Sequence, residues 1–298
     1  MSVSEERGSR HEVRLDSGSI AYRERGAGDP IVFVHPIFTN GDLWRDVVPS
    51  LAEQYRCITP DWPLGSHSVR MDRDADLSPP GLADLVGGFL DALDLHDVTL
   101  VGNDTGGAIS QLVVARHPER VARLVLVSCD AFEVFPPRLF AYLKLTARMP
   151  GGVFLAAQSL RWRLLRRLPI TYGWLTHAPL DREAGDSYVR PLARHRDIRR
   201  DAKKVVRGLH PRHTLAAAER FGAFDRPALV VWGEDDRVFP RSLGERLAYA
   251  LPRARLKIVA GARTLVSEDR PAQLAGMIRD FMAGTDLSAP APPATASA

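Results

Sequence analysis

The sequence predicts an α/β fold in which a mostly parallel central sheet carries helices on both faces. Two observations lead to this prediction. Short apolar runs alternate with longer segments of helical periodicity over residues 12–128, and the same alternation resumes after residue 226. The apolar runs are continuous, which is typical of strands buried on both faces of a parallel sheet. Alternation of strands and helices along a chain favours such parallel pairing.

Each element of the first half is predicted from its own pattern. Residues 12–23 indicate two short strands around a glycine turn, and the run IVFVH at 31–35 indicates the first buried strand. Apolar residues at helical spacing predict a helix over 41–55, although Pro49 interrupts it. The elements expected next are strand 55–60, helix 81–95, strand 98–102, helix 107–117 and strand 121–128.

The alternation is interrupted between residues 131 and 225. This segment has arginine-rich helical pieces, several prolines and little β-strand signal, so we expect a helical cap over the carboxyl edge of the sheet. The alternation then resumes with strand 228–233, helix 241–250, strand 256–260 and helix 270–282. The predicted organisation is a flexible N-terminus at 1–10, a core at 11–130 and 226–283, the cap at 131–225, and a disordered Ala/Pro-rich tail at 284–298.

The composition is that of an ordinary globular protein, with 45% hydrophobic and 26% charged residues. The charged N-terminal segment has no apolar core of a secretory signal, and no apolar run approaches the roughly 20 residues that a membrane span needs. We therefore expect a cytoplasmic protein without stable membrane insertion. Cys57 and Cys129 are expected to be two buried free thiols.

Basic residues give a net charge of +4 and cluster at 161–167 and 190–213. The simpler interpretation is a solvated helical face. The alternative is a surface that attracts an anionic substrate, an acidic carrier domain or a membrane. No nucleic-acid-binding module accompanies the charge, so no nucleic-acid partner is expected.

The turn Gly102-Asn103-Asp104-Thr105-Gly106 joins the strand at 98–102 to the helix at 107–117. An abrupt turn of this kind strains the backbone of Asp104 and lifts its side chain clear of the sheet, next to a helix N-terminus that favours a carboxylate. The N–H of Thr105 is then available to stabilise an oxyanion or a halide. The alternative interpretation is that Asp104 only caps the helix.

This turn resembles the nucleophile elbow of the α/β-hydrolase family. The resemblance runs from about residue 12 to residue 283 outside the cap, and it is strongest to the haloalkane dehalogenase and epoxide hydrolase branch, whose nucleophile is an aspartate. It implies an α/β-hydrolase fold, with the cap inserted after the strand that follows the elbow helix. It also implies that Asp104 is the nucleophile and that the N–H groups of Ile37 and Thr105 form the oxyanion hole. Pro36 stands where that family usually has glycine.

The resemblance also places the partners of the nucleophile. The segment WGEDDRVFP matches the acid region, with Asp236 at the acid position, and Asp130 stands at an alternative acid position used by some dehalogenases. Thr264 stands where the family has its catalytic histidine. Threonine cannot act as a general base near neutral pH, and a positioned base is worth roughly 10²–10⁴ in rate. His67, in the loop after the strand at 55–60, is a candidate replacement by proximity.

Three functional hypotheses remain open from the sequence. The default is a hydrolase that acts through Asp104 on a small, mostly apolar molecule. The second is a lyase, cyclase or isomerase in which Asp104 is an acid or base, and the third is an inactive ligand-binding relative. No cofactor is expected, since G-N-D-T-G-G lacks the second glycine of the dinucleotide motif. His210 and His213 alone are too few ligands to predict a metal site, and the oligomeric state is open.

Overall fold

The computed structural model describes residues 8–284 and contains an eight-stranded sheet. The strands are β1 (Ser9–Leu15), β2 (Gly18–Arg25), β3 (Pro30–Val34), β4 (Arg56–Pro60), β5 (Val98–Asp104), β6 (Val121–Cys129), β7 (Ala228–Gly233) and β8 (Ala254–Val259). Their spatial order is β1-β2-β4-β3-β5-β6-β7-β8. Only the pairs β1·β2 and β2·β4 are antiparallel, so the mostly parallel sheet is confirmed.

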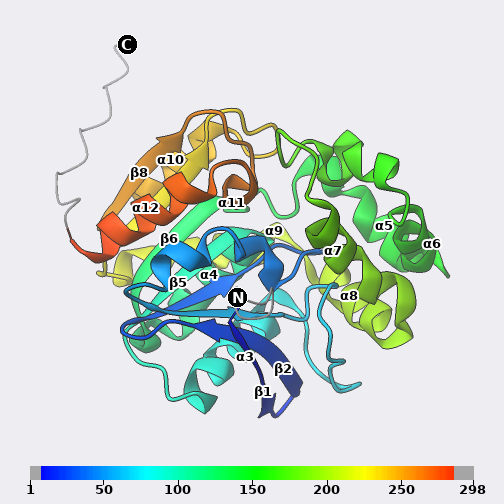
Figure 1. Ribbon diagram of the computed structural model, residues 1–298, viewed down its shortest axis with the longest axis horizontal. Helices are drawn as coiled ribbons and strands as arrows, with labels where there is room; N and C mark the ends of the chain where they lie inside the picture. The colour runs from blue at the N-terminus through cyan, green and yellow to red at the C-terminus, as the bar shows by residue number, and fades with distance from the viewer. Residues whose placement is uncertain (1–7, 285–298) are drawn as a thin grey trace.

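Helices cover both faces of the sheet (Figure 1). The helices around the sheet are η1 (Gly41–Trp44), α2 (Val48–Leu51), α3 (Pro79–Ala92), α4 (Thr105–Arg116), η2 (Pro118–Arg120), α9 (Pro211–Ala218), η6 (Phe221–Ala223), α10 (Arg241–Ala250), α11 (Val266–Asp269) and α12 (Pro271–Met282). The helices inserted between β6 and α9 are η3 (Arg138–Phe140), α5 (Tyr142–Arg148), α6 (Gly152–Ser159), η4 (Arg163–Arg167), η5 (Pro169–Gly173), α7 (Arg182–Arg194) and α8 (Arg196–Gly208). No helix within residues 8–284 is long and apolar enough to cross a membrane.

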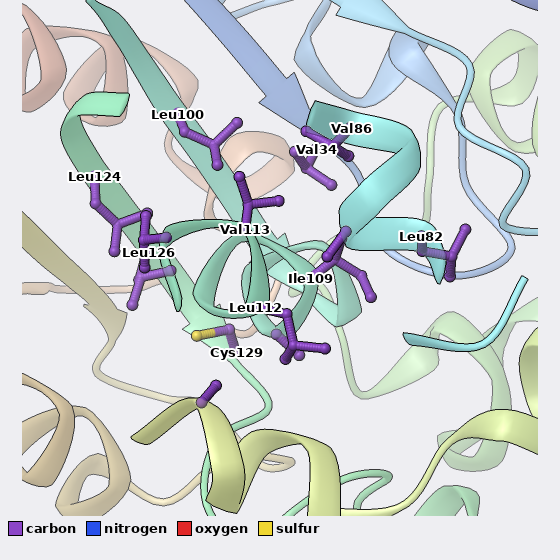
Figure 2. Close-up of a cluster of buried hydrophobic side chains, with 14 of the residues drawn as sticks. Val34, Leu82, Val86, Leu100, Ile109, Leu112, Val113, Leu124, Leu126 and Cys129 are labelled. Atoms are coloured by element: carbon purple, nitrogen blue, oxygen red, sulfur yellow. The ribbon is translucent and has the colours of Figure 1, made fainter. Parts of the chain in front are cut away.

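Alternate residues of the buried strands belong to two separate hydrophobic cores, one on each face of the sheet. In β5, Leu100 belongs to the core that also contains residues of α3, α4 and α10, whereas its neighbour Val101 belongs to the core that contains residues of α2 and α12. Figure 2 shows part of the first of these cores, where Val113 of α4 points toward Leu100 of the sheet and Ile109 points toward α3. Continuous apolar runs in the sequence are therefore the consequence of two covered faces.

Two local expectations need correction. The helix expected over 41–55 is two short pieces, η1 and α2, because Pro49 lacks the N–H that a continuous helix needs and instead begins a new one. The flexible N-terminus expected at 1–10 is wrong for residues 9 and 10, because Ser9 and Arg10 pair with β2. Residues 1–7, and residues 285–298 of the expected tail, lie outside the described residues. Cys57 and Cys129 are both free and buried, as predicted.

The helical insertion divides into two parts. Helices α5 to α8 lie together at one end of the molecule, whereas α9 packs against α4 (Figure 1). Ala217 of α9 and Phe221 of η6 belong to the same hydrophobic core as α3 and α4. The last part of the segment expected as a cap at 131–225 therefore packs on the sheet domain.

The turn between β5 and α4 requires three glycines. A Cβ on Gly102 would lie 2.4 Å from Ser110 Oγ, one on Gly106 would lie 2.2 Å from the carbonyl oxygen of Val34, and one on Gly107 would lie 2.4 Å from Cys129 Cβ. Strand and helix thus approach each other more closely than any residue with a Cβ allows. This approach fixes where the side chain between them, Asp104, is held.

We predict that Gly107→Ala destabilises the protein by about 1–3 kcal/mol, because its new Cβ overlaps Cys129 in a packed core. The matched control is Gly88→Ala in α3, where no heavy atom lies within 4 Å of the added Cβ. That variant is expected to gain about 0.5–1 kcal/mol from the better helix propensity of alanine. Urea unfolding measures both, and equal stability of the two variants would contradict the close approach.

Candidate active site

Asp104 lies at the junction of β5 and α4 with a backbone conformation of φ 51° and ψ −123°. A non-glycine residue rarely has positive φ, and such strain is concentrated at functional sites. The Asp104 carboxylate accepts hydrogen bonds from the N–H of Thr105 and, at 3.1 Å, from the Thr105 hydroxyl. The Thr105 N–H expected to be available for an oxyanion therefore binds Asp104 itself in this structure.

A second carboxyl group, that of Asp130, lies against Asp104. Asp130 follows β6 and is buried, and its carboxyl is close enough to that of Asp104 for each group to shift the pKa of the other. Its Oδ1 atom has no hydrogen-bond partner in the described chain. Two carboxylates in contact cannot both be ionised at neutral pH. Burial is the main cause that raises the pKa of Asp104 to about 6, and burial together with the charge of Asp104 raises the pKa of Asp130 well above its usual range. Of the two carboxyls, Asp130 is therefore the one that keeps its proton more strongly at neutral pH.

Asp236 and Thr264, the predicted acid and the residue at the predicted histidine position, are in contact. Asp236 Oδ1 accepts hydrogen bonds from the Thr264 hydroxyl at 2.8 Å and from the N–H groups of Val238 and Phe239 at 2.8 and 3.0 Å. Burial raises the pKa of Asp236, and its negative charge adds to the raised pKa of Asp104. The structure thus brings the residues predicted from three distant segments to one edge of the sheet.

Asn103 ties these segments together, a role that the sequence reasoning did not assign. Its side-chain amide donates to the carbonyl oxygens of Val127, Ser128 and Thr264 at 2.7, 3.2 and 2.9 Å. A polar residue inside a fully buried strand was the available signal, because such a residue must find partners. Asn103 holds the Thr264 loop against the ends of β5 and β6.

A cavity of about 230 Å³ lies in front of Asp104 and Thr105. Ile37 and Phe38 line it from the sheet domain, and most other lining residues are apolar side chains of the inserted helices. Two lining tyrosines direct their hydroxyls to backbone carbonyls, Tyr142 to Ile170 and Tyr172 to Phe38, each at 2.6 Å. Among the described lining residues Asp104 has the only carboxyl group and none is a histidine, so an apolar ligand there would meet one ionisable carboxyl.

Ile37 also lines the cavity, as its predicted role at the oxyanion hole requires. Within residues 8–284 its N–H forms no hydrogen bond, whereas the N–H groups of Phe38 and Thr39 bind Leu64 and Pro36. The Ile37 N–H therefore has no hydrogen-bond partner in the described chain, whereas the Thr105 N–H is bound to Asp104.

His35 and His67 follow strands that end at this edge of the sheet, but their rings form hydrogen bonds with groups outside the candidate site. His35 accepts a hydrogen bond from the Trp62 N–H and donates to the Pro36 carbonyl, and burial lowers its pKa to about 3, so it stays neutral. His67 contacts Asp201 at 3.3 Å and accepts from the Gly65 N–H. Neither lines the cavity. The described residues contain no group of three or more His, Cys, Asp or Glu side chains that could hold a metal ion.

The chain belongs to the α/β-hydrolase fold family, whose model matches residues 29–271. Haloalkane dehalogenase 2 of Mycobacterium bovis is 26% identical over 271 residues, covering 88% of this chain and 90% of its own. The cis-3-alkyl-4-alkyloxetan-2-one decarboxylase of Shewanella oneidensis is 24% identical over 295 residues, covering 94% and 90%. The epoxide hydrolase CorEH, a solved structure, superposes with a TM-score of 0.78 at 20% identity, covering 93% of this chain and 99% of its own. The last likeness concerns the fold alone.

Replacing Asp104 with asparagine should stabilise the folded protein at high pH. The pKa of Asp104 is about 6 when folded and 3.8 as an unperturbed carboxyl, so the folded state binds the proton more tightly. The carboxyl has no destabilising effect below pH 4 and destabilises increasingly as the pH rises through 6. We expect Asp104→Asn to gain about 1–3 kcal/mol at pH 8 and little at pH 4.

Thermal unfolding at the two pH values measures this difference. The exposed Asp225 supplies the control variant Asp225→Asn, which should change stability little at either pH. A stability gain for Asp104→Asn that is the same at both pH values would rule out the raised pKa of Asp104.

The Thr264 hydroxyl should stabilise the folded protein more at high pH than at low pH. Thr264→Val removes the donor to Asp236 Oδ1, and a hydrogen bond to an ionised group is worth about 1.5–3 kcal/mol. Without that donor the folded pKa of Asp236 rises further, so stability is lost as the pH increases and the loss is smaller when Asp236 is protonated. The matched control is Thr99→Val, because the buried Thr99 hydroxyl has no hydrogen-bond partner in the described chain. Denaturant unfolding at pH 8 and pH 4 tests whether only Thr264→Val is destabilising.

Proposed function

We propose that this chain is an enzyme that acts on a small, mostly apolar molecule by proton transfer through the Asp104 carboxyl. The observation that carries the proposal is the Asp104–Asp130 pair at an apolar cavity without a histidine. Burial, with a smaller contribution from the charge of Asp236, raises the pKa of Asp104 to about 6, which is the range of an efficient general acid or base. The reaction class is lyase, cyclase or isomerase.

Each part of the site has a place in such a reaction. The ionised Asp104 takes a proton from a substrate carbon or hydroxyl, and the same proton is returned to another substrate atom or leaves with the departing group. Asp130 keeps its own proton and stabilises the ionised Asp104 by its hydrogen bond. The Ile37 N–H is a donor for an oxygen on which negative charge develops. The apolar lining excludes water, which would otherwise compete for the proton.

The comparisons are compatible with chemistry other than hydrolysis. The Shewanella oneidensis relative, which spans nearly the whole chain, is named as a decarboxylase. The same fold therefore accommodates a non-hydrolytic reaction in a related protein. This supports the present proposal without identifying the substrate.

The second candidate is hydrolysis through an ester of Asp104, as in the default hypothesis from the sequence. It is favoured by the strained turn at Asp104 and by the haloalkane dehalogenase relative. The carboxylate would attack a carbon, and the leaving group would depart with the bonding electron pair. Water must then be activated to cleave the ester, and the cavity lining supplies no histidine for that step. If the Asp104 carboxylate attacks a substrate carbon, we therefore expect the resulting ester to accumulate.

Isotope labelling distinguishes the candidates. Purified protein is incubated with small apolar haloalkanes, epoxides, lactones and ketones in D₂O and, separately, in ¹⁸O-labelled water. Proton transfer predicts a product without ¹⁸O, with deuterium only where the proton on Asp104 exchanges with solvent before it is returned, no adduct on the Asp104 peptide, and a rate that rises with pH around 6. Asp104→Asn should reduce the rate by roughly 10²–10⁴ while Asp225→Asn leaves it unchanged.

Two other outcomes would overturn the proposal. An alkyl adduct on Asp104, or ¹⁸O in the product, identifies hydrolytic chemistry. Ligands that raise the melting temperature equally for the parent and for Asp104→Ala, without turnover of any compound, identify a binding protein.

A further inference from the structure

The inserted helices expose an unusual number of large apolar side chains. Of the large hydrophobic residues that are exposed in the described structure, all but Leu215 and Tyr249 belong to residues 142–170. They are Tyr142, Leu145, Met149, Phe154, Leu155, Trp162, Leu164, Leu168 and Ile170. Trp162 and Leu164 are each 74% exposed. Scattered exposed apolar residues need no explanation, but a gathering of this kind on one part of a protein marks an interaction surface.

All charged side chains (Asp, Glu, Lys or Arg) of this part of the chain are basic. Between Glu133 and Asp181 the sequence has no acidic residue, whereas it has seven basic ones. They are Arg138, Lys144, Arg148, Arg161, Arg163, Arg166 and Arg167. Arg163 and Arg166 form ion pairs with Asp186 of α7. Within residues 8–284 the other five have no carboxylate within ion-pair distance, so their positive charge is available to a partner.

The position of this surface is at the edge of the molecule. Figure 1 shows α5 and α6 at the end opposite α12, with α7 and α8 between them and the sheet. Three residues that line the cavity in front of Asp104, namely Tyr142, Leu168 and Ile170, are also among the exposed apolar residues. The cavity therefore borders on this surface.

We propose that residues 142–170 form a docking surface for an anionic lipid membrane, on which the protein binds peripherally. Exposed leucines and a tryptophan interleaved with arginines are suited to the boundary between acyl chains and negatively charged headgroups. A second copy of the chain is disfavoured as occupant, because five unpaired basic residues would face their own copies. An apolar molecule dissolved in the lipid would enter the cavity without crossing water. The entry of a substrate from the lipid rests on the proposed function, whereas the binding of the protein to the lipid does not.

Vesicle sedimentation with the full chain tests the docking surface. The probes are phosphatidylcholine vesicles with and without phosphatidylglycerol, at low and high salt. The parent protein should bind the anionic vesicles, weakly bind the neutral ones, and lose binding as salt rises. Arg148→Gln/Arg167→Gln should lower the partition coefficient about 25-fold, or about fivefold for each charge. The matched control, Arg253→Gln/Arg279→Gln, changes two basic residues outside the segment and should bind like the parent.

A second pair of variants tests how much the exposed apolar side chains contribute to vesicle binding. Trp162→Ser should reduce binding about tenfold or more, because an inserted indole removes a large apolar area from water. Tyr249→Ser is the control, since Tyr249 is 82% exposed on α10, outside the segment. Both substitutions are at exposed positions and should leave the melting temperature unchanged. Quenching of tryptophan emission by brominated lipid, lost in Trp162→Phe, reports insertion directly.

Some results would overturn the lipid surface. One is the absence of binding to anionic vesicles, and another is binding that neither Arg148→Gln/Arg167→Gln nor Trp162→Ser weakens. A dimer in solution that Trp162→Ser dissociates, without vesicle binding, would identify a second copy as the occupant. Asp104→Asn should bind vesicles like the parent, so a failure of the proposed chemistry and a failure of the lipid surface are distinguishable.

Discussion

The contact between the Asp104 and Asp130 carboxyls is the interaction around which the candidate site is organised. Two acids placed together in a buried site cannot both ionise, so the pair keeps a proton at neutral pH. The folded chain supports this arrangement with the close packing of β5 and α4 and with the hydrogen bonds from Thr105. The local free-energy cost of the buried charge is the reason the carboxyl is poised near neutral pH.

The neighbouring polar groups extend that arrangement rather than form a conventional set with histidine. Thr264 donates to Asp236, and Asn103 holds the Thr264 loop against the strand ends. Each hydroxyl or amide in this network satisfies a buried acceptor. The result is an electrostatic environment that positions a carboxyl beside an apolar cavity whose described lining contains no histidine.

The inserted helices connect this site to the outside. Their inner side chains line the cavity, and their outer side chains form the apolar and basic surface at residues 142–170. Because Tyr142, Leu168 and Ile170 belong to both, the route to the cavity and the candidate lipid surface are the same part of the molecule. An apolar substrate and an apolar entrance are mutually consistent.

The sequence by itself determined the sheet, its mostly parallel character and the turn at Asp104, because these follow from local patterns such as continuous apolar runs and glycines at fixed spacing. It also placed Asp236 and Thr264 at one edge of the sheet, through the resemblance to a known family. Only the tertiary structure decided that Asp130 contacts Asp104, that His67 binds Asp201, and that the Thr105 N–H binds its neighbour. Those outcomes depend on which side chains meet across distant segments and on how deeply they are buried, and neither is encoded in a local pattern.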